Sequence, residues 1–218
     1  MTASSQLLQT DRTKLRRKAD RGTFDRAAAD AILDEAYIAH VGFVVDGGPK
    51  VLPMTYGRDG DVLYLHGAVG NAMLRASDDA EVCVTVTLLD GLVLARSAFH
   101  HSMNYRSVVL LGTATRVDDE AEKARAFDVL VEHVVPGRTA EARGATPSEL
   151  RQTLVLRLPI EEGSVKVRAG DSLDDPEDVG LAVWAGSVPL RLVAADPVPN
   201  ADFDPSLAEP PAADRFVR

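Results

Sequence analysis

The sequence predicts a mainly β fold of the α+β class, in which an antiparallel sheet closes into a barrel with flanking helices. Three observations predict it. Segments that alternate apolar and polar residues, or are rich in β-branched residues, recur along the chain, and about seven of them satisfy the pattern of a strand. Short turn sequences such as Asp59-Gly60 join neighbouring strands, which favours antiparallel pairing. Only residues 26–35 and 120–134 form long helical patterns, which disfavours a doubly wound parallel sheet.

Composition divides the chain into three parts. Residues 1–22 are polar and charged, with a basic cluster from Arg12 to Arg21 that we interpret as a solvated leader paired with the acidic body. Residues 23–193 form the barrel domain, and residues 194–218, rich in Pro, Asp and Ala, form an extended C-terminal arm. The length suits one domain.

The barrel domain begins with a helix and two hairpins. Asp25 can cap the helix at 26–35, which should cover one end of the core. Strong turn chemistry at 46–49 then separates the strand Tyr37 to Val45 from the strand Lys50 to Tyr56. Asp59-Gly60 reverses the chain into the strand Val62 to His66.

A glycine-rich corner follows that strand. Gly67-Ala68-Val69-Gly70 leads to Asn71, which suits the cap of a short helix carrying Met73 and Leu74. A loop entering a helix presents free backbone N–H groups, and phosphate is their usual anionic ligand. The same pattern also occurs in corners that bind nothing, so geometry alone leaves both interpretations open.

The second half of the domain continues the strand pattern. Glu81 to Leu89 alternates, and Asp90-Gly91 is predicted to turn the chain into a second hairpin with Leu92 to Ala95. Tyr105 to Val117 reads as a long strand, in which Gly112 marks a bulge or bend. The remaining elements are an amphipathic helix at 120–134 capped by Asp118-Asp119, strands at 152–160 and 164–168, an acidic loop from Asp171, and a last apolar block at 181–193.

Charge and cysteine content exclude several classes of function. The net charge of −9 argues against binding to nucleic acids or anionic membranes, because phosphates repel carboxylates. Cys83 is the only cysteine, so no intrachain disulfide forms, and alternation with valines favours a buried, inert thiol. No second cluster of ligands accompanies His100 and His101, so no metal site is expected. Without a signal peptide or a membrane-spanning apolar run, we expect a cytoplasmic protein.

Several motifs together carry a family resemblance. They are Arg21 and Asp25 before the first helix, V-L-P-M-T-Y at 51–56, L-Y-L-H-G-A at 63–68 and N-Y-R-S-V-V-L-L-G at 104–112. With them the chain resembles the FMN-binding split-barrel family related to pyridoxamine 5'-phosphate oxidase, and most closely its nitroimidazole reductase-like branch. The match is firm from Arg12 to Val117. It implies an antiparallel split β-barrel and a homodimer that holds FMN at its interface.

The resemblance also implies which residues bind the flavin. The strand residues that would contact the ring edge are Leu52, Pro53, Met54 and Thr55. The corner that would hold the phosphate comprises His66, Gly67, Ala68, Val69, Gly70, Asn71, Ala72 and Met73. The strand that would pass beside the cofactor comprises Tyr105, Arg106, Ser107 and Val108, and the guanidinium of Arg106 suits bidentate pairing with phosphate.

Two departures from the family pattern qualify these expectations. Ala72 stands where many relatives carry a phosphate-binding Lys, so Arg75, Arg106 or the backbone must replace its charge. Trp184-Ala185-Gly186 resembles the Trp-x-Gly that true pyridoxamine phosphate oxidases place near the flavin, but the basic pattern that follows it there is absent at 187–190. Vitamin B6 oxidation is therefore not expected. Trp184 is either a flavin neighbour or an anchor in the core or interface.

The leading functional hypothesis is an FMN-dependent oxidoreductase of unknown small-molecule substrate, with NADH or NADPH as candidate electron donor. Because the flavin supplies the redox chemistry, no catalytic acid or base is assigned. His66 either contacts phosphate or substrate or is structural, and His100 and His101 could face substrate. The alternatives are a non-catalytic flavin-nucleotide carrier or sensor and a deazaflavin- or haem-binding relative.

A homodimer is expected on separate grounds as well. The apolar strands, such as 37–45 and 108–111, offer more apolar surface than one barrel interior and two helices can cover. A two-fold interface is the commonest way to bury such a surplus.

Overall fold

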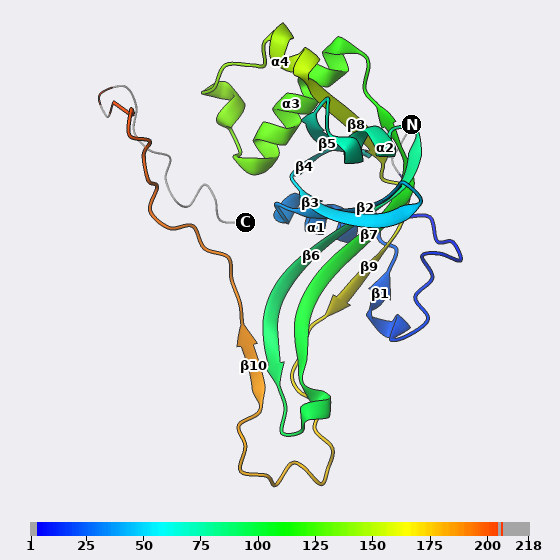
Figure 1. Cartoon of the computed structure of the whole chain (residues 1–218). Coiled ribbons are helices and arrows are strands. Elements are labelled where there is room, and N and C mark those ends of the chain that lie inside the picture. Colours follow the sequence, from blue (N-terminus) through cyan, green and yellow to red (C-terminus); the bar gives the residue numbers. More distant parts are fainter. Residues whose placement is uncertain (1–3, 205, 207–218) are drawn as a thin grey trace.

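The structure is a computed structural model that describes residues 4–204 and 206 (Figure 1). Its described part contains four α-helices and ten strands. The helices are α1 (Arg26–Glu35), α2 (Ala72–Ser77), α3 (Glu120–Val134) and α4 (Pro147–Gln152). The strands are β1 (Gly22–Thr23), β2 (Ala39–Val45), β3 (Gly48–Met54), β4 (Tyr56–Asp59), β5 (Val62–Ala68), β6 (Ala80–Leu94), β7 (Ser102–Arg116), β8 (Thr153–Pro159), β9 (Glu162–Arg168) and β10 (Gly186–Pro189). Short 3₁₀ turns lie at η1 (Ala19–Arg21), η2 (Ala98–His100) and η3 (Arg138–Ala140).

The strands form one antiparallel sheet that curls around a single main core. Its order is β3-β2-β6-β7-β8-β5-β4, with β9 also paired to β7 and β10 to β6. All described pairings between these strands are antiparallel, so the predicted antiparallel barrel with flanking helices is confirmed. Apolar residues from α1, α2 and the inward faces of the strands fill the core. α3 covers a second, smaller apolar cluster on the outer face of β5 and β8.

Helix boundaries follow the capping residues in the sequence. The side chain of Asp25 accepts a hydrogen bond from the backbone N–H of Ala28 at 3.0 Å, so α1 begins at Arg26 as predicted. Asp119 caps α3 in the same way. The structure adds α4, where Thr146 and Glu149 form a reciprocal capping box that the sequence analysis did not identify.

The predicted strand from Lys50 to Tyr56 is two strands. β3 ends at Met54, paired with Ala39 at the start of β2, and β4 begins at Tyr56, paired with β5. The chain changes partner at Thr55 because the Tyr56 ring is fully buried there and its hydroxyl donates to the carbonyl oxygen of Leu33 at 2.6 Å.

The predicted hairpin turn at Asp90-Gly91 is wrong. β6 runs without reversal from Ala80 to Leu94, and only a register shift between Leu89 and Gly91 marks a bulge. Glycine suits position 91 because β10 pairs closely alongside it: a Cβ there would lie 3.0 Å from the carbonyl oxygen of Val188. Gly112 carries no bulge, since it pairs in regular register with Val82; on its other edge β7 passes from β9 to β8 between Leu111 and Thr115.

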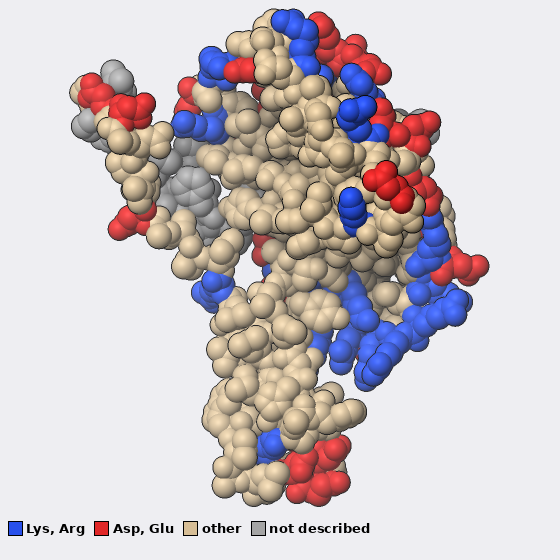
Figure 2. Space-filling model, viewed as in Figure 1, with Lys and Arg blue, Asp and Glu red and all other residues tan. Residues whose placement is uncertain are grey.

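The leader is more closely attached than expected. Leu7 is buried in the main core, and Arg12 forms ion pairs with Glu81 and Glu162. The rest of the basic cluster lies at the surface, where Figure 2 shows basic side chains gathered beside the leader. Of the basic cluster, Arg12 thus pairs with acidic residues of the barrel as expected. The side chains of Lys14, Arg16, Arg17 and Lys18 are exposed.

β6 and β7 extend well beyond the barrel as a long hairpin (Figure 1). β10 runs along this extension, and the chain from 190 to 204 then leaves as an arm without helix or strand. The segment predicted to form the C-terminal arm, 194–218, holds no helix or strand up to residue 204; most of its remainder lies outside the described residues. Many apolar side chains of the hairpin and arm are exposed, including Phe99, Met103, Leu192 and Val193.

Candidate functional site

The strand expected to contact the flavin ring is an exposed sheet edge. β3 pairs only with β2, and five successive residues from Pro49 to Pro53 are exposed, although Val51 and Leu52 are apolar. Edge strands usually hide or break such a surface. Leu52, Pro53, Met54 and Thr55 therefore lie where a ligand or another chain could cover them.

The corner between β5 and α2 has the predicted shape but fewer free donors than expected. Asn71 caps α2, and its side-chain oxygen accepts hydrogen bonds from the N–H groups of Met73 and Leu74 at 3.0 and 3.3 Å. The N–H of Val69 donates to the carbonyl of Gln152, and that of Asn71 to Ala68. Among the described residues this leaves the N–H groups of Gly70 and Ala72 for an anion.

Side chains at the corner divide into packed and exposed ones. Met73 is buried in the core, so its side chain is structural. Gly67 approaches α2 so closely that a Cβ there would lie 2.8 Å from Leu74 Cδ1. Arg75 follows Ala72 by one helical turn, is exposed and has no ion pair within the described residues, so it is the cation best placed to replace the missing Lys.

Arg106 is engaged elsewhere. Its guanidinium contacts Glu35 at 2.7 Å and Asp90 at 2.7 Å, and these hydrogen bonds, Glu35 first, raise its pKa above the usual value. It lies eight residues before Ala114, which pairs with Ala80 near α2, or about 26 Å along β7 at 3.3 Å per residue. The structure does not bring Arg106 to the phosphate corner within one chain.

The other predicted residues of β7 and the tryptophan also lie apart from the corner. Val108 is fully buried in the core, while Tyr105 and Ser107 are partly exposed on the hairpin side. Trp184 is 63% exposed and lies against Gly186, at which φ is 156°. This exposure excludes the interpretation of Trp184 as a core anchor in a single chain and leaves the interface and flavin interpretations.

Glu35, Asp90 and Arg106 form the polar wall of a groove of about 970 Å³. The apolar residues of its lining include Ile38, Leu89 and, from the arm, Leu190, Leu192 and Val193. No short sequence pattern predicts this groove, because its walls come from α1, β2, β6, β7 and the arm, which lie far apart in the chain.

His66 occupies an unusual position for a histidine. It lies on the face of β5 that α3 covers, with its ring centroid 6.5 Å from that of Phe127. Its Nδ1 atom is buried and has no hydrogen-bond partner, and burial lowers the pKa of the imidazole below its ordinary value. A buried polar atom without a partner is costly and calls for an explanation.

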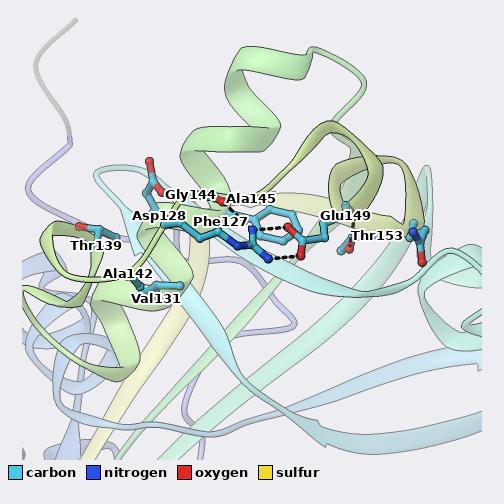
Figure 3. A pocket seen from close by; sticks show the side chains of 11 residues that line it. Phe127, Asp128, Val131, Thr139, Ala142, Gly144, Ala145, Glu149 and Thr153 are labelled. Atoms are coloured by element: carbon cyan, nitrogen blue, oxygen red, sulfur yellow. Dashed lines mark hydrogen bonds and ion pairs between the residues drawn. The ribbon is translucent and has the colours of Figure 1, made fainter. Parts of the chain in front are cut away.

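A pocket of about 560 Å³ opens beside this face, between α3, η3, α4 and the start of β8 (Figure 3). Phe127, Val131, Ala142 and Ala145 give it an apolar lining. Arg143 lies at the same pocket and pairs with Glu149 through two hydrogen bonds of 2.7 and 2.9 Å, drawn as dashed lines in Figure 3. Together with the Thr146 hydrogen bonds, this pairing lowers the pKa of Glu149 to about 2.

Comparison with known proteins places this architecture in a family. The sequence profile described as Pyridoxamine 5'-phosphate oxidase matches residues 25–167. The chain belongs to the pyridoxamine 5'-phosphate oxidase family. The antiparallel split barrel of the pyridoxamine 5'-phosphate oxidase family, and the resemblance seen in the sequence motifs, are thereby confirmed.

Two solved structures resemble nearly the whole chain. The flavocytochrome Anf3 from Azotobacter vinelandii is 39% identical over 95% of this chain and 97% of its own, with a TM-score of 0.88. The FAD and heme binding protein from Mycobacterium smegmatis is 38% identical over 90% of this chain and 97% of its own, with a TM-score of 0.85.

Similarity to the expected nitroimidazole branch is weaker. A protein assigned to 5-nitroimidazole antibiotic resistance, from Bacteroides thetaiotaomicron, is 26% identical over 67% of this chain and 86% of its own, with a TM-score of 0.56. The search of curated proteins found no match. The β6–β7 hairpin lies within the segment matched by the family profile, whereas β10 and the arm lie beyond it; the two flavocytochrome-like relatives match 95% and 90% of the chain.

The described residues hold neither a membrane-spanning helix nor a cluster of metal ligands. None of the helices in residues 4–204 is both long enough and apolar enough to cross a membrane. Among the described residues of the chain, no three His, Cys, Asp or Glu side chains are grouped so that they could hold a metal ion. Cys83 is a partly buried free thiol.

Proposed function

We propose that this protein is a redox flavoprotein that binds FAD together with haem. The observation that carries the proposal is the likeness, over 95% of the chain, to a flavocytochrome, supported by a second relative described as binding FAD and heme. These relatives favour the haem-binding alternative over the oxidoreductase with FMN as its only cofactor. They also favour FAD over FMN as the flavin.

The residues of the chain suit a flavin. The exposed edge strand β3 offers unpaired backbone groups to a ring system, together with the apolar side chains of Leu52 and Pro53. The corner offers the N–H groups of Gly70 and Ala72, with Arg75 nearby as a cation for phosphate. A bound flavin supplies electron or hydride transfer, whereas the chain binds it, orients it and excludes water.

We also propose that the protein uses its flavin to turn over a small-molecule substrate. The family and its relatives are consistent with a redox protein, and two classes remain to be separated: an oxidoreductase reduced by NADH or NADPH, and a flavin carrier or sensor that no donor reduces. Anaerobic addition of each nicotinamide nucleotide to the purified protein distinguishes them. Bleaching of the flavin band supports the oxidoreductase, and a stable oxidised spectrum supports the carrier.

The cofactor proposal is tested by the absorption spectrum and by analysis of the released cofactors. The purified protein is expected to show both a flavin band and a haem Soret band, and heat denaturation is expected to release FAD. Release of FMN alone would contradict the choice of FAD, and a colourless protein that binds neither added FAD nor added haem would contradict the proposal as a whole.

The phosphate corner makes a separate prediction. Arg75→Ala should weaken flavin binding by about 1.5–3 kcal/mol if Arg75 makes a charge-assisted hydrogen bond to phosphate. Ala72→Lys should tighten binding, because the exposed position would regain the cation that many relatives carry there. Isothermal titration of the apoprotein with FAD measures both changes. Arg116→Ala is a matched control, since Arg116 is exposed at the end of β7 and pairs with Asp118.

Dimerisation remains part of the proposed function. The flavin would lie at an interface between two copies, which would also cover the exposed β3 edge. Arg106 lies far along β7 from the β5–α2 corner of its own chain. In a dimer, it could contact only a flavin held at the corner of the second copy. A small-molecule electron donor would reach the flavin from solvent.

A further inference from the structure

Six cations gather at one edge of the sheet, in a chain whose net charge is −9. We call this group the basic patch; it comprises Lys14, Arg16, Arg17, Lys18 and Arg21 of the leader and Lys166 of β9. Within the described residues none of the six forms an ion pair, whereas Arg12 beside them pairs with Glu81 and Glu162. Figure 2 shows basic side chains gathered on this part of the surface. The basic patch is therefore a local concentration of positive charge that the chain itself does not neutralise.

Contacts with the barrel hold the basic patch in place. Leu15 packs on Gly22 so closely that a Cβ at Gly22 would lie 2.0 Å from Leu15 Cδ1. The ammonium of Lys166 donates to the carbonyl oxygen of Arg17 at 3.4 Å, and Lys166 also pairs with Gly22 in the β1–β9 ladder. Lys18 has a φ of 55°, a left-handed conformation that is rare for residues other than glycine and that occurs often at functional positions. The cations thus lie on an organised surface of the fold.

The basic patch lies at the opposite edge of the sheet from β3. The strand pairings run β3-β2-β6-β7-β9-β1, so a dimer formed through β3 leaves the basic patch uncovered. Lys166 pairs with Ser107 of β7, and it lies on the outer face of β9 because its neighbour Val165 is buried in the core. β1 is two strands from β7, or about 10 Å at the usual spacing between strands. A partner bound to the basic patch would therefore lie near the strand that the family resemblance puts beside the cofactor.

An acidic protein is the partner that complements this surface. Exposed cations attract carboxylates over a long range, which speeds the association of oppositely charged proteins. Exposed carboxylates border the basic patch at Asp11, Asp20 and Glu161. A nucleic-acid duplex, with one charge per about 1.7 Å of its axis, would bring phosphates against these carboxylates. A compact group of carboxylates on a folded protein avoids that repulsion.

We propose that the basic patch is a docking surface for an acidic electron-carrier protein. This inference rests on the proposed function, because a protein that binds a flavin and haem needs a source of electrons. In each encounter the reduced carrier loses one electron and the ferric haem iron gains it, so neither a proton nor a further reactant is required. Encounters between redox proteins bury little surface, and a charged docking surface suits such a transient contact.

The test measures the association of the purified protein with a plant-type [2Fe–2S] ferredoxin, which serves as an acidic one-electron carrier. The combined substitutions Lys14→Glu, Arg16→Glu and Arg17→Glu should lower the association rate constant at low salt roughly tenfold or more, because repulsion replaces electrostatic attraction. Raising the salt from about 0.01 M to about 1 M shortens the Debye length from about 30 Å to about 3 Å. The wild-type rate constant should then fall towards that of the variant. Surface plasmon resonance measures both changes.

A matched control removes the same number of cations elsewhere on the surface. Lys50, Arg151 and Arg191 are exposed and lie outside the basic patch, so Lys50→Glu, Arg151→Glu and Arg191→Glu together should leave the association rate constant close to that of the wild type. Thermal unfolding and FAD content show whether each variant is folded. Equal losses in the two triple variants would overturn the proposal, as would a ferredoxin that does not bind at low salt.

Three further outcomes separate this inference from other roles of the basic patch. Tighter binding of a DNA duplex or of phosphatidylserine vesicles than of ferredoxin, lost in the patch variant, would overturn the choice of an acidic protein. Weaker binding of FAD to the folded patch variant would assign the basic patch to the flavin site and overturn the docking surface. Wild-type protein that binds neither cofactor but docks ferredoxin through the basic patch would overturn the proposed function and leave the docking surface standing.

Discussion

Replacing Arg26 by alanine is expected to lower the free energy of unfolding by about 3 kcal/mol, the largest single-residue effect we expect on stability. The Arg26 side chain is only 8% exposed at the start of α1. It donates to the carboxylates of Asp30 and Asp61 at 2.7 and 2.8 Å, and to the carbonyl oxygens of Gly60 and Ile160 at 2.8 and 3.1 Å.

These contacts join three parts of the fold through one guanidinium. Gly60 and Asp61 form the β4–β5 turn, and Ile160 lies between β8 and β9. Truncation removes the donor from both carbonyl groups at once, and solvent can compensate only part of the loss because the site is nearly closed. Arg26→Lys should restore only a fraction, since an ammonium lacks the fork that reaches separate acceptors.

Urea unfolding of the wild type and variants measures this effect. Arg125→Ala is the control, because Arg125 is 67% exposed in its pair with Asp59 and surface pairs contribute about 0–1 kcal/mol. Equal effects of the two substitutions would show that burial of Arg26 does not determine its contribution. A change in the slope with urea concentration would instead indicate a changed unfolded state or loss of two-state behaviour.

The elements that could be predicted from the sequence are those that local chemistry determines. Asp25 and Asn71 are capping residues whose partners lie two or three residues away, so α1 and α2 begin where the sequence places them. Strand alternation likewise located β5, β7 and β9. By contrast, the change of strand partner at Thr55 depends on the burial of Tyr56 against α1, and β6 continues through Asp90-Gly91 where β10 pairs alongside it. Such contacts are non-local, and no short pattern encodes them.

The same distinction between local and non-local contacts applies to the candidate site. The corner was visible because glycine and asparagine at fixed offsets determine its backbone, but its free donors were overestimated, since the side chain of Asn71 occupies two of them. Arg106 was assigned to phosphate because the family resemblance places its strand beside the cofactor and because a guanidinium can pair bidentately with phosphate. Its actual partner Glu35 is 71 residues away in the chain, so only the folded structure could reveal that pair.

The second large effect that we expect is the dissociation of a homodimer when the exposed edge of β3 is altered. Val51 is 61% exposed and Leu52 is 45% exposed, on a strand whose outer edge carries unpaired backbone groups. A second copy of this chain is the occupant that fits best, because the hairpin extension and the arm present further exposed apolar residues, among them Leu192 and Val193, that the same association could bury.

Substituting both Val51 and Leu52 by glutamate should therefore convert a dimer into a monomer. Each apolar side chain buried at an interface contributes about 1.5–3 kcal/mol, and a two-fold axis uses each position twice, so the dimer dissociation constant should rise by on the order of 10⁴-fold or more. Lys50→Glu is the matched control on the same strand, since Lys50 is already polar and exposed. Sedimentation velocity over a dilution series, with and without FAD, measures the change.

Flavin binding should respond to the same substitutions if the site is completed by both chains. A ligand that requires the assembled state stabilises it by mass action, so FAD should shift the wild-type dimer to lower protein concentrations. The double variant should then bind FAD more weakly even though the β5–α2 corner is intact, whereas Lys50→Glu should not. A monomeric double variant that keeps full FAD affinity would place the whole flavin site within one chain, and a wild-type protein that sediments as a monomer at all concentrations would contradict the dimer itself.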